Sequence, residues 1–304
     1  MTSSEIGWIG VGAMGAPMCL NLLRAGHRLT VCDRDSARVA SMVAAGATAA
    51  DSPREVAARA DVVFSTIFDD QGLRDIVAGP NGLAAGARPQ AAYIDMSTVS
   101  PAASADVARV LAERGVDYLR APVSGTVTLA SSARLSTFVS GPPEVFERLR
   151  PLLAVLTARQ RHVGTGEEAR VVKLLINLMV FMSTAVLGEA IDFGERAGLT
   201  RDTILDAVND SIVASAHYAG KAEKIAHRDY APVGPISLVV KDMDLALAVA
   251  NHHQAALPIA AQVRQSLALM QAQGLAGLDV AALADLPALL RSLSPIQDRQ
   301  GDTP

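Results

Sequence analysis

The stretch Gly10-Val11-Gly12-Ala13-Met14-Gly15 decides the fold, because it forms a G-x-G-x-x-G turn between an apolar run, 6–9, and a helix-like segment, 17–25. In such a turn the first glycine permits a tight bend. The second lets backbone N–H groups approach a pyrophosphate, and the third lets helix and strand pack closely. The helix N-terminus adds unpaired N–H groups and a positive dipole end. The sequence therefore predicts a dinucleotide-binding turn with contacts from Gly10, Gly12, Ala13, Met14 and Gly15.

Asp33 ends the next apolar run, 29–32. It lies roughly 20 residues beyond the glycines, where a carboxylate that binds the adenosine ribose is expected. Its charge, with that of Asp35, disfavours a 2′-phosphate and predicts NAD as the cofactor. Arg34 favours NADP instead, because a guanidinium can pair with that 2′-phosphate. NADP therefore remains possible.

The first half of the chain alternates strand-like runs with alanine-rich helical stretches, whereas only helical segments follow residue 167. This rhythm predicts an α/β fold with an N-terminal Rossmann domain, a doubly wound parallel sheet. A long helix joins it to a C-terminal all-α domain. We expect the Rossmann domain over 1–164, an all-helical substrate and dimerisation domain over 165–293, and a flexible tail over 294–304.

Composition narrows the class of protein. Half of the 304 residues are apolar and the net charge is −4, which gives no general attraction to nucleic acid. We expect Cys19 and Cys32 to be buried thiols of a reducing compartment. The most apolar stretch, 174–187, is too short to span a bilayer. His252 and His253 are adjacent and cannot share a helix face as metal ligands. The sequence predicts a cytoplasmic protein without a metal, membrane or nucleic-acid partner.

Four further segments follow the glycine turn in order, and together they resemble the β-hydroxyacid dehydrogenase family. That family includes 3-hydroxyisobutyrate dehydrogenase, tartronate semialdehyde reductase and the glyoxylate/succinic semialdehyde reductases. The resemblance implies an NAD(P)-dependent oxidoreductase that moves a hydride between the nicotinamide and a small 3-hydroxy acid or its semialdehyde. The segments are Asp95-Met96-Ser97-Thr98, Ala121-Pro122-Val123-Ser124-Gly125, Gly164-x-Gly166 with Lys173 and Asn177, and Lys241-Asp242.

Lys173 and Asn177 are four residues apart and share one face of a helix. Apolar neighbours would lower the pKa of Lys173 toward the range of a general acid/base. From the residues alone, a lysine that extends to the surface is an equal alternative. The resemblance favours proton transfer by Lys173 and a substrate hydrogen bond from Asn177, against the alternative of a satisfied buried amide.

The other site residues also have two interpretations. The resemblance implies that Ser124 and Gly125, with Thr126, hold the substrate carboxylate; a plain turn is the alternative. It implies that Ser97 and Thr98 contact the nicotinamide side of the cofactor, where helix capping is the alternative. It also implies that Lys241 reaches the nicotinamide, against a solvated helix pair.

The sequence departs from the family pattern near the pocket. Arg120 stands where the family has an aspartate, Thr126 where it has a glycine, and Phe68 where it has a proline. A glycine expected near Ala133 is also absent. These changes leave the reaction type standing but put the usual small substrates in doubt.

Two other functions compete with this interpretation, namely an imine reductase of the same architecture and a non-catalytic nucleotide-binding scaffold. Relatives of both kinds usually lack the lysine, so Lys173 argues against them. The apolar helices after residue 164 exceed what one small domain can bury. We therefore expect a homodimer or homotetramer formed through them.

Overall fold

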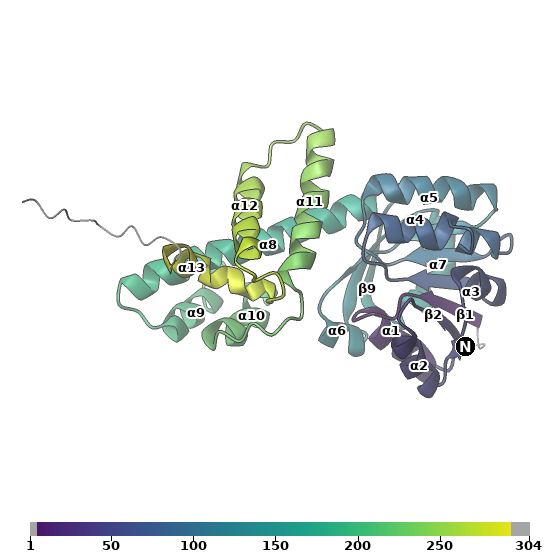
Figure 1. Cartoon of the computed structure of the whole chain (residues 1–304), viewed down its shortest axis with the longest axis horizontal. Coiled ribbons are helices and arrows are strands. Elements are labelled where there is room, and N and C mark those ends of the chain that lie inside the picture. The colour runs from purple at the N-terminus through teal and green to yellow at the C-terminus, as the bar shows by residue number, and fades with distance from the viewer. Residues whose placement is uncertain (1–4, 293–304) are drawn as a thin grey trace, which may run out of the picture. The chain divides into compact units, whose positions relative to one another are not determined.

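The computed structural model describes residues 5–292 and divides into two compact units, with the division between Leu175 and Ile176. The expected tail, 294–304, lies outside the described residues. The first unit is built on a parallel sheet and the second is helical (Figure 1). The Rossmann fold followed by an all-helical domain is confirmed.

The sheet of the first unit has the strand order β3-β2-β1-β4-β5-β6-β8-β7, and β9 pairs with β8. Strands β1 to β6 pair with one another in parallel, whereas β8 runs antiparallel to β6 and β7. The chain order reverses between β1 and β4, which makes a crevice at their carboxyl ends. The strands are β1 Glu5–Ile9, β2 Arg28–Cys32, β3 Thr48–Ala49, β4 Val62–Ser65, β5 Ala92–Asp95, β6 Asp117–Arg120, β7 Val123–Ser124, β8 Leu135–Ser140 and β9 Thr157–Gly164.

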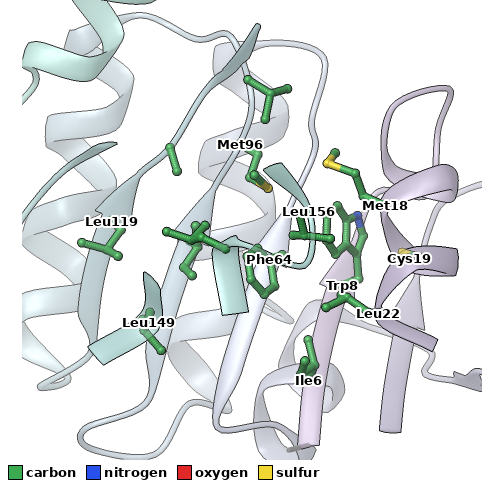
Figure 2. Close-up of a cluster of buried hydrophobic side chains, with 14 of the residues drawn as sticks. Ile6, Trp8, Met18, Cys19, Leu22, Phe64, Met96, Leu119, Leu149 and Leu156 are labelled. Atoms are coloured by element: carbon green, nitrogen blue, oxygen red, sulfur yellow. The ribbon is translucent and has the colours of Figure 1, made fainter. Parts of the chain in front are cut away.

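Helices cover both faces of this sheet. One core contains side chains of α1 Gly15–Arg24, α2 Ser36–Ala44, α6 Val127–Ser131 and α7 Pro143–Leu153. The other contains those of α3 Pro53–Arg59, α4 Asp70–Ala78 and α5 Pro101–Glu113, beside the short helix η1 Leu83–Ala85. In the first core the rings of Trp8 and Phe64 stack with centroids 5.2 Å apart, and Met18 and Leu22 of α1 lie beside them (Figure 2).

Among the described residues, the second unit packs five α-helices and one short 3₁₀ helix around α8 Glu168–Arg196, which begins in the first unit. Its core includes Phe181 of α8, Met243 of α11 and Leu267 of α12. The remaining elements are α9 Arg201–Asn209, α10 Ala216–Ala226, α11 Ile236–His252, α12 Pro258–Ala272, η2 Val280–Asp285 and α13 Leu286–Ser292.

Two local features differ from the sequence-based expectation. Strand β9 was not foreseen, because Thr-Ala-Arg-Gln-Arg-His-Val-Gly has no apolar alternation; it is joined to β8 through the backbone. The sequence also predicts one helix over 280–293, whereas the structure has the 3₁₀ helix η2 followed by α13 within the described residues. Pro287 explains the break, because proline removes a backbone donor and blocks a continuous α-helix.

Candidate active site

Two side-chain hydrogen-bond donors hold the glycine turn between β1 and α1. The Gly10 carbonyl accepts hydrogen bonds from Trp8 Nε1 at 3.0 Å and from Thr66 Oγ1 at 2.5 Å. Gly10 has a φ of +89°, which favours glycine. A Cβ on Gly15 would lie 2.5 Å from Thr66 Oγ1 and would also collide with the Gly10 carbonyl. Both positions therefore require glycine.

The N-terminus of α1 faces this turn without a side-chain cap, since Met14 at the N-cap makes no side-chain hydrogen bond. The first backbone N–H groups of a helix lack partners within the helix, and they bind anions readily. Ala13 is exposed, and Gly12 leaves its own side open apart from one guanidinium. These residues fit a dinucleotide pyrophosphate.

Asp33, at the end of β2, is folded back onto the glycine turn. Its Oδ2 accepts a hydrogen bond from the Val11 N–H at 2.7 Å, and its Oδ1 accepts one from the Asp35 N–H at 2.9 Å. The structure thus brings the predicted ribose carboxylate next to the predicted phosphate turn. Arg34, between them, is exposed.

Asp35 and Arg38 have roles that the sequence did not indicate. Asp35 caps α2 through the Ala37 N–H at 3.0 Å and forms an ion pair with Arg38 at 3.2 Å. Arg38 Nη1 lies 3.5 Å from where a Cβ of Gly12 would stand. A second guanidinium therefore lies beside the phosphate turn. Arg38 lies 26 residues after Gly12 in the chain, and no sequence motif indicated that it would lie beside this turn.

The loops after β4 and β5 meet at the same edge of the sheet. The Ile67 N–H donates to Ser97 Oγ at 2.7 Å, and Ser97 Oγ donates to Asp95 at 2.5 Å. Helix α5 is capped by Ser100, which accepts from the Ala103 N–H at 3.0 Å. Ser97 is buried and Thr98 is half-buried, while Phe68 on the neighbouring loop is exposed.

The loop between β7 and α6 carries the predicted carboxylate site. Ser124 is half-buried, and Gly125 has a φ of +140°, where a Cβ would come within 2.7 Å of Leu135. Thr126 caps α6 and accepts from the Leu129 N–H at 3.4 Å. Its hydroxyl is therefore tied to the helix start. Ala133, near the position of the missing family glycine, has a left-handed φ of +55°.

Arg120, which stands where the family has an aspartate, is buried and forms an ion pair with Glu167. Its guanidinium donates to Glu167 Oε1 at 2.9 Å and lies 4.2 Å from the ring centroid of Tyr118. The chain between Glu167 and Ala169 is also anchored to β8, because the Ala169 N–H donates to Ser140 Oγ at 3.2 Å. Lys173 is half-buried on α8, one helical turn after this anchored start.

In the second unit, Asn177 and the Lys241-Asp242 pair come together. Asn177 Nδ2 donates to Asp242 Oδ2 at 2.7 Å, and Lys241 Nζ lies 2.8 Å from Asp242 Oδ1. Asn177 is 9% exposed and Asp242 4% exposed. The sequence singled out Asn177 and Lys241 but assigned no role to Asp242, which holds both side chains. Within residues 5–292, no group of three His, Cys, Asp or Glu residues could hold a metal.

Two family models cover nearly the whole chain. Residues 5–164 match the NAD-binding domain of 6-phosphogluconate dehydrogenase. Residues 167–286 match the NAD-binding domain of NADP-dependent 3-hydroxyisobutyrate dehydrogenase.

Individual relatives agree with these models. The chain is 34% identical to 2-(hydroxymethyl)glutarate dehydrogenase of Eubacterium barkeri, over 92% of this chain and 94% of that protein. It is 31% identical to L-threonate dehydrogenase of Cupriavidus necator, over 92% and 95%. A solved structure of Mycobacterium tuberculosis 3-hydroxyisobutyrate dehydrogenase has a TM-score of 0.86 at 26% identity and covers 95% of this chain and all of that one.

Solved imine reductases resemble the chain at 18% to 20% identity, which shows a shared fold alone. One described helix, α8, is long and apolar enough to cross a membrane by length and composition, so the expectation that the apolar stretch 174–187 is too short is wrong. A core helix of a soluble protein meets the same test, and the family is one of soluble enzymes. The family models and the relatives together show that the chain belongs to the β-hydroxyacid dehydrogenase family, as an NAD(P)-dependent oxidoreductase that acts on hydroxy acids.

Proposed function

We propose that this enzyme interconverts a small 3-hydroxy acid and its semialdehyde, with Lys173 as the general acid/base. The bound nicotinamide supplies the hydride acceptor or donor. Lys173 takes the hydroxyl proton in oxidation and returns it in reduction. The observation that carries this proposal is a half-buried lysine one turn after a helix start that is hydrogen-bonded to β8 and to the Ser97 carbonyl in the loop after β5.

The remaining residues bind and orient. We assign the pyrophosphate to the glycine turn and α1, the adenosine ribose to Asp33, and the nicotinamide side to Ser97, Thr98 and Lys241. Ser124, Gly125 and Thr126 take the substrate carboxylate. Because the Asn177 amide nitrogen donates to Asp242, its amide oxygen remains to accept a hydrogen bond from the substrate hydroxyl.

Replacement of Lys173 tests the mechanism. Lys173→Ala should lower kcat roughly 10²–10⁴-fold and remove the limb of the pH–rate profile set by its ionisation. Cofactor affinity should change little, because the glycine turn and Asp33 are untouched. Lys173→Arg should not restore turnover, since a guanidinium does not release its proton near neutral pH. Near-normal turnover by Lys173→Ala would overturn the mechanism and leave the fold standing.

A matched variant separates proton transfer from positioning. Asn177→Ala should cost less than Lys173→Ala and should appear partly in KM, as expected for a residue that orients the substrate. Steady-state kinetics of both variants on one accepted substrate provide the comparison. Equal losses confined to kcat would argue against a positioning role for Asn177.

We propose NAD as the preferred cofactor. The Asp33 carboxylate beside the glycine turn suits the ribose hydroxyls and repels a 2′-phosphate. Arg38 is occupied by Asp35, which weakens its pull on that phosphate. The ratio of kcat/KM for NAD and NADP decides the question. A clear preference for NADP would mean that Arg34 and Arg38 dominate.

We propose that the enzyme is at least a dimer formed through its helical unit, as a homodimer or homotetramer. Helix α8 exposes Met179, Val186 and Phe193, of which Phe193 is 75% exposed. Their seven-residue spacing places them along one stripe of the helix, a pattern that favours contact with another helix. Analytical ultracentrifugation at micromolar protein should show a dimer or larger. A monomer alone would refute the proposal.

A further inference from the structure

Arg170, in the first turn of α8, is completely buried together with its ionic partner. Its Nη2 donates to Asp95 Oδ2 at 2.5 Å and to Tyr118 Oη at 2.8 Å. Its Nη1 donates to the Ser97 carbonyl at 2.8 Å, and its Nε donates to Ser104 Oγ at 3.3 Å. The side chains of both Arg170 and Asp95 are 0% exposed. The guanidinium fork therefore joins α8 to β5, β6, α5 and the loop after β5.

Asp95 extends these contacts toward the crevice. Its second oxygen, Oδ1, accepts from Ser65 Oγ at 2.7 Å and from Ser97 Oγ at 2.5 Å. Ser97 Oγ in turn accepts from the Ile67 N–H at 2.7 Å. Hydrogen bonds thus run without a gap from the loop after β4, through the loop after β5, to the start of α8.

Stability alone does not explain such a pair. Burying two charges costs several kcal/mol per ion in solvation, and well-packed apolar residues often stabilise a protein as much or more. A planar guanidinium offers five donors in fixed directions, which sets geometry more tightly than apolar contact does. Here those directions orient the Ser97 carbonyl and the helix turn that precedes Lys173.

We propose that Arg170 is a positioning residue that locks the Ser97–Thr98 loop to the first turn of α8, one turn before Lys173. The inference rests on the proposed roles of Lys173 and of that loop. It assigns Arg170 the task of keeping the proton-transfer lysine and the nicotinamide-side loop in one geometry, without contact to substrate. Asp95 is the anchor through which it acts.

The test compares Arg170→Lys with Tyr118→Phe. Lysine keeps the positive charge but loses the fork, so a single nitrogen replaces the two that hold the Ser97 carbonyl and the Asp95 carboxylate. Phenylalanine removes one partner of Arg170 and leaves its contacts to Asp95 and to the Ser97 carbonyl intact. Trp8 is the single tryptophan of the chain and lies beside the glycine turn, so its fluorescence reports binding of NADH and of ADP-ribose, which lacks the nicotinamide.

We expect Arg170→Lys to lower kcat roughly 10- to 100-fold, because small misplacements of reacting groups cost that much. NADH affinity should fall several-fold while ADP-ribose affinity stays unchanged. Tyr118→Phe should lower Tm with little change in kcat or in the ratio of the two affinities. If Arg170→Lys lowers Tm but leaves kcat and that ratio at wild-type values, Arg170 is merely structural and the proposal is wrong.

A second variant keeps the proposal testable if Arg170→Lys does not fold. The double variant Arg170→Gln with Asp95→Asn removes both charges together and retains hydrogen-bonding groups, which avoids an unpaired buried ion. The proposal expects the same loss of kcat and of NADH affinity from this variant, and wild-type values would overturn it. The affinity ratio does not depend on Lys173, so failure of the general-base assignment remains distinguishable from failure of this inference.

Discussion

Buried charges serve different purposes in the two units. In the nucleotide-binding unit, the Arg170–Asp95 pair lies at the carboxyl ends of the strands and binds Ser97, a candidate site residue. In the helical unit, Asp279 is fully buried and accepts from Lys221 Nζ at 2.6 Å and from the Gly234 N–H at 3.0 Å. Those partners belong to α10 and to the loop before α11.

A second cluster of charges in the helical unit is partly buried, since Asp285 is 18% exposed and Arg228 is 57% exposed. Asp285 accepts from Arg201 Nη2 at 2.7 Å, from Tyr230 Oη at 2.5 Å and from Arg228 Nε at 3.1 Å. None of these partners is a candidate site residue. In the first unit the residues that hold the fold also shape the candidate site. In the second, Asp279 and Asp285 hold the fold, whereas Asn177, Lys241 and Asp242 form the candidate site.

The strongest test of this contrast is Asp279→Asn. The substitution leaves the 13% exposed Lys221 ammonium without its anion and turns an amide toward backbone donors. Breaking one partner of a buried pair typically costs about 3–5 kcal/mol, so the free energy of unfolding should fall by that amount. The cofactor dissociation constant of the folded variant should equal that of the wild type. Urea unfolding and fluorescence titration provide the two measurements.

Asp244→Asn is the matched control for this variant. Asp244 pairs with Arg264 at 2.6 Å but is 53% exposed, so its loss should cost at most about 1 kcal/mol. Equal destabilisation by the two variants, or loss of cofactor affinity in Asp279→Asn alone, would remove the distinction between the two units.

Lowering the pH should destabilise the helical unit by protonating Asp279 and Asp285. The free energy of unfolding should fall by less than it does in Asp279→Asn. Burial is the largest single influence and raises the pKa of Asp279 and Asp285, but the hydrogen bonds that each carboxylate accepts and the positive charges beside it together leave both pKa values lowered. A lowered folded-state pKa contributes stability that is present above the unfolded pKa of about 3.9 and is lost as the pH falls through the folded value.

Urea unfolding followed by circular dichroism between about pH 3 and pH 7 measures this dependence. This range brackets the ordinary carboxyl pKa of about 4. Stability should decline below about pH 4, and the decline should be shallower in Asp279→Asn, which has one carboxylate fewer. An identical pH dependence in variant and wild type would show that Asp279 is not a source of this stability.

The smallest predicted change in the free energy of unfolding concerns the backbone conformation of Ala133. Ala133 has a φ of +55°, where an L-residue is strained and glycine is not. Ala133→Gly should raise the free energy of unfolding by up to about 1 kcal/mol, because relief of strain exceeds the added chain entropy. Ala130→Gly, inside α6, should lower it by about 1 kcal/mol. Destabilisation by both would show that Ala133 is not strained.

Short-range sequence patterns predicted much of the fold of this protein. The glycine turn, Asp33 and the alternation of strands and helices lie close together in the chain, so short-range patterns indicate the dinucleotide-binding half directly. Long apolar periodicity after residue 167 indicated the helical half. Strand β9 was missed because its stability comes from pairing with β8 and not from an apolar pattern of its own.

The sequence by itself determined the Rossmann half, the all-helical half and the family-like order of Ser97, Ser124, Lys173, Asn177 and Lys241. Only the tertiary structure decided how buried polar groups pair. Asn177 and Asp242 are 65 residues apart in the chain, and Asp95 and Arg170 are 75 apart. A buried donor must find an acceptor because an unpaired one is costly, but the folded path of the chain selects which acceptor that is.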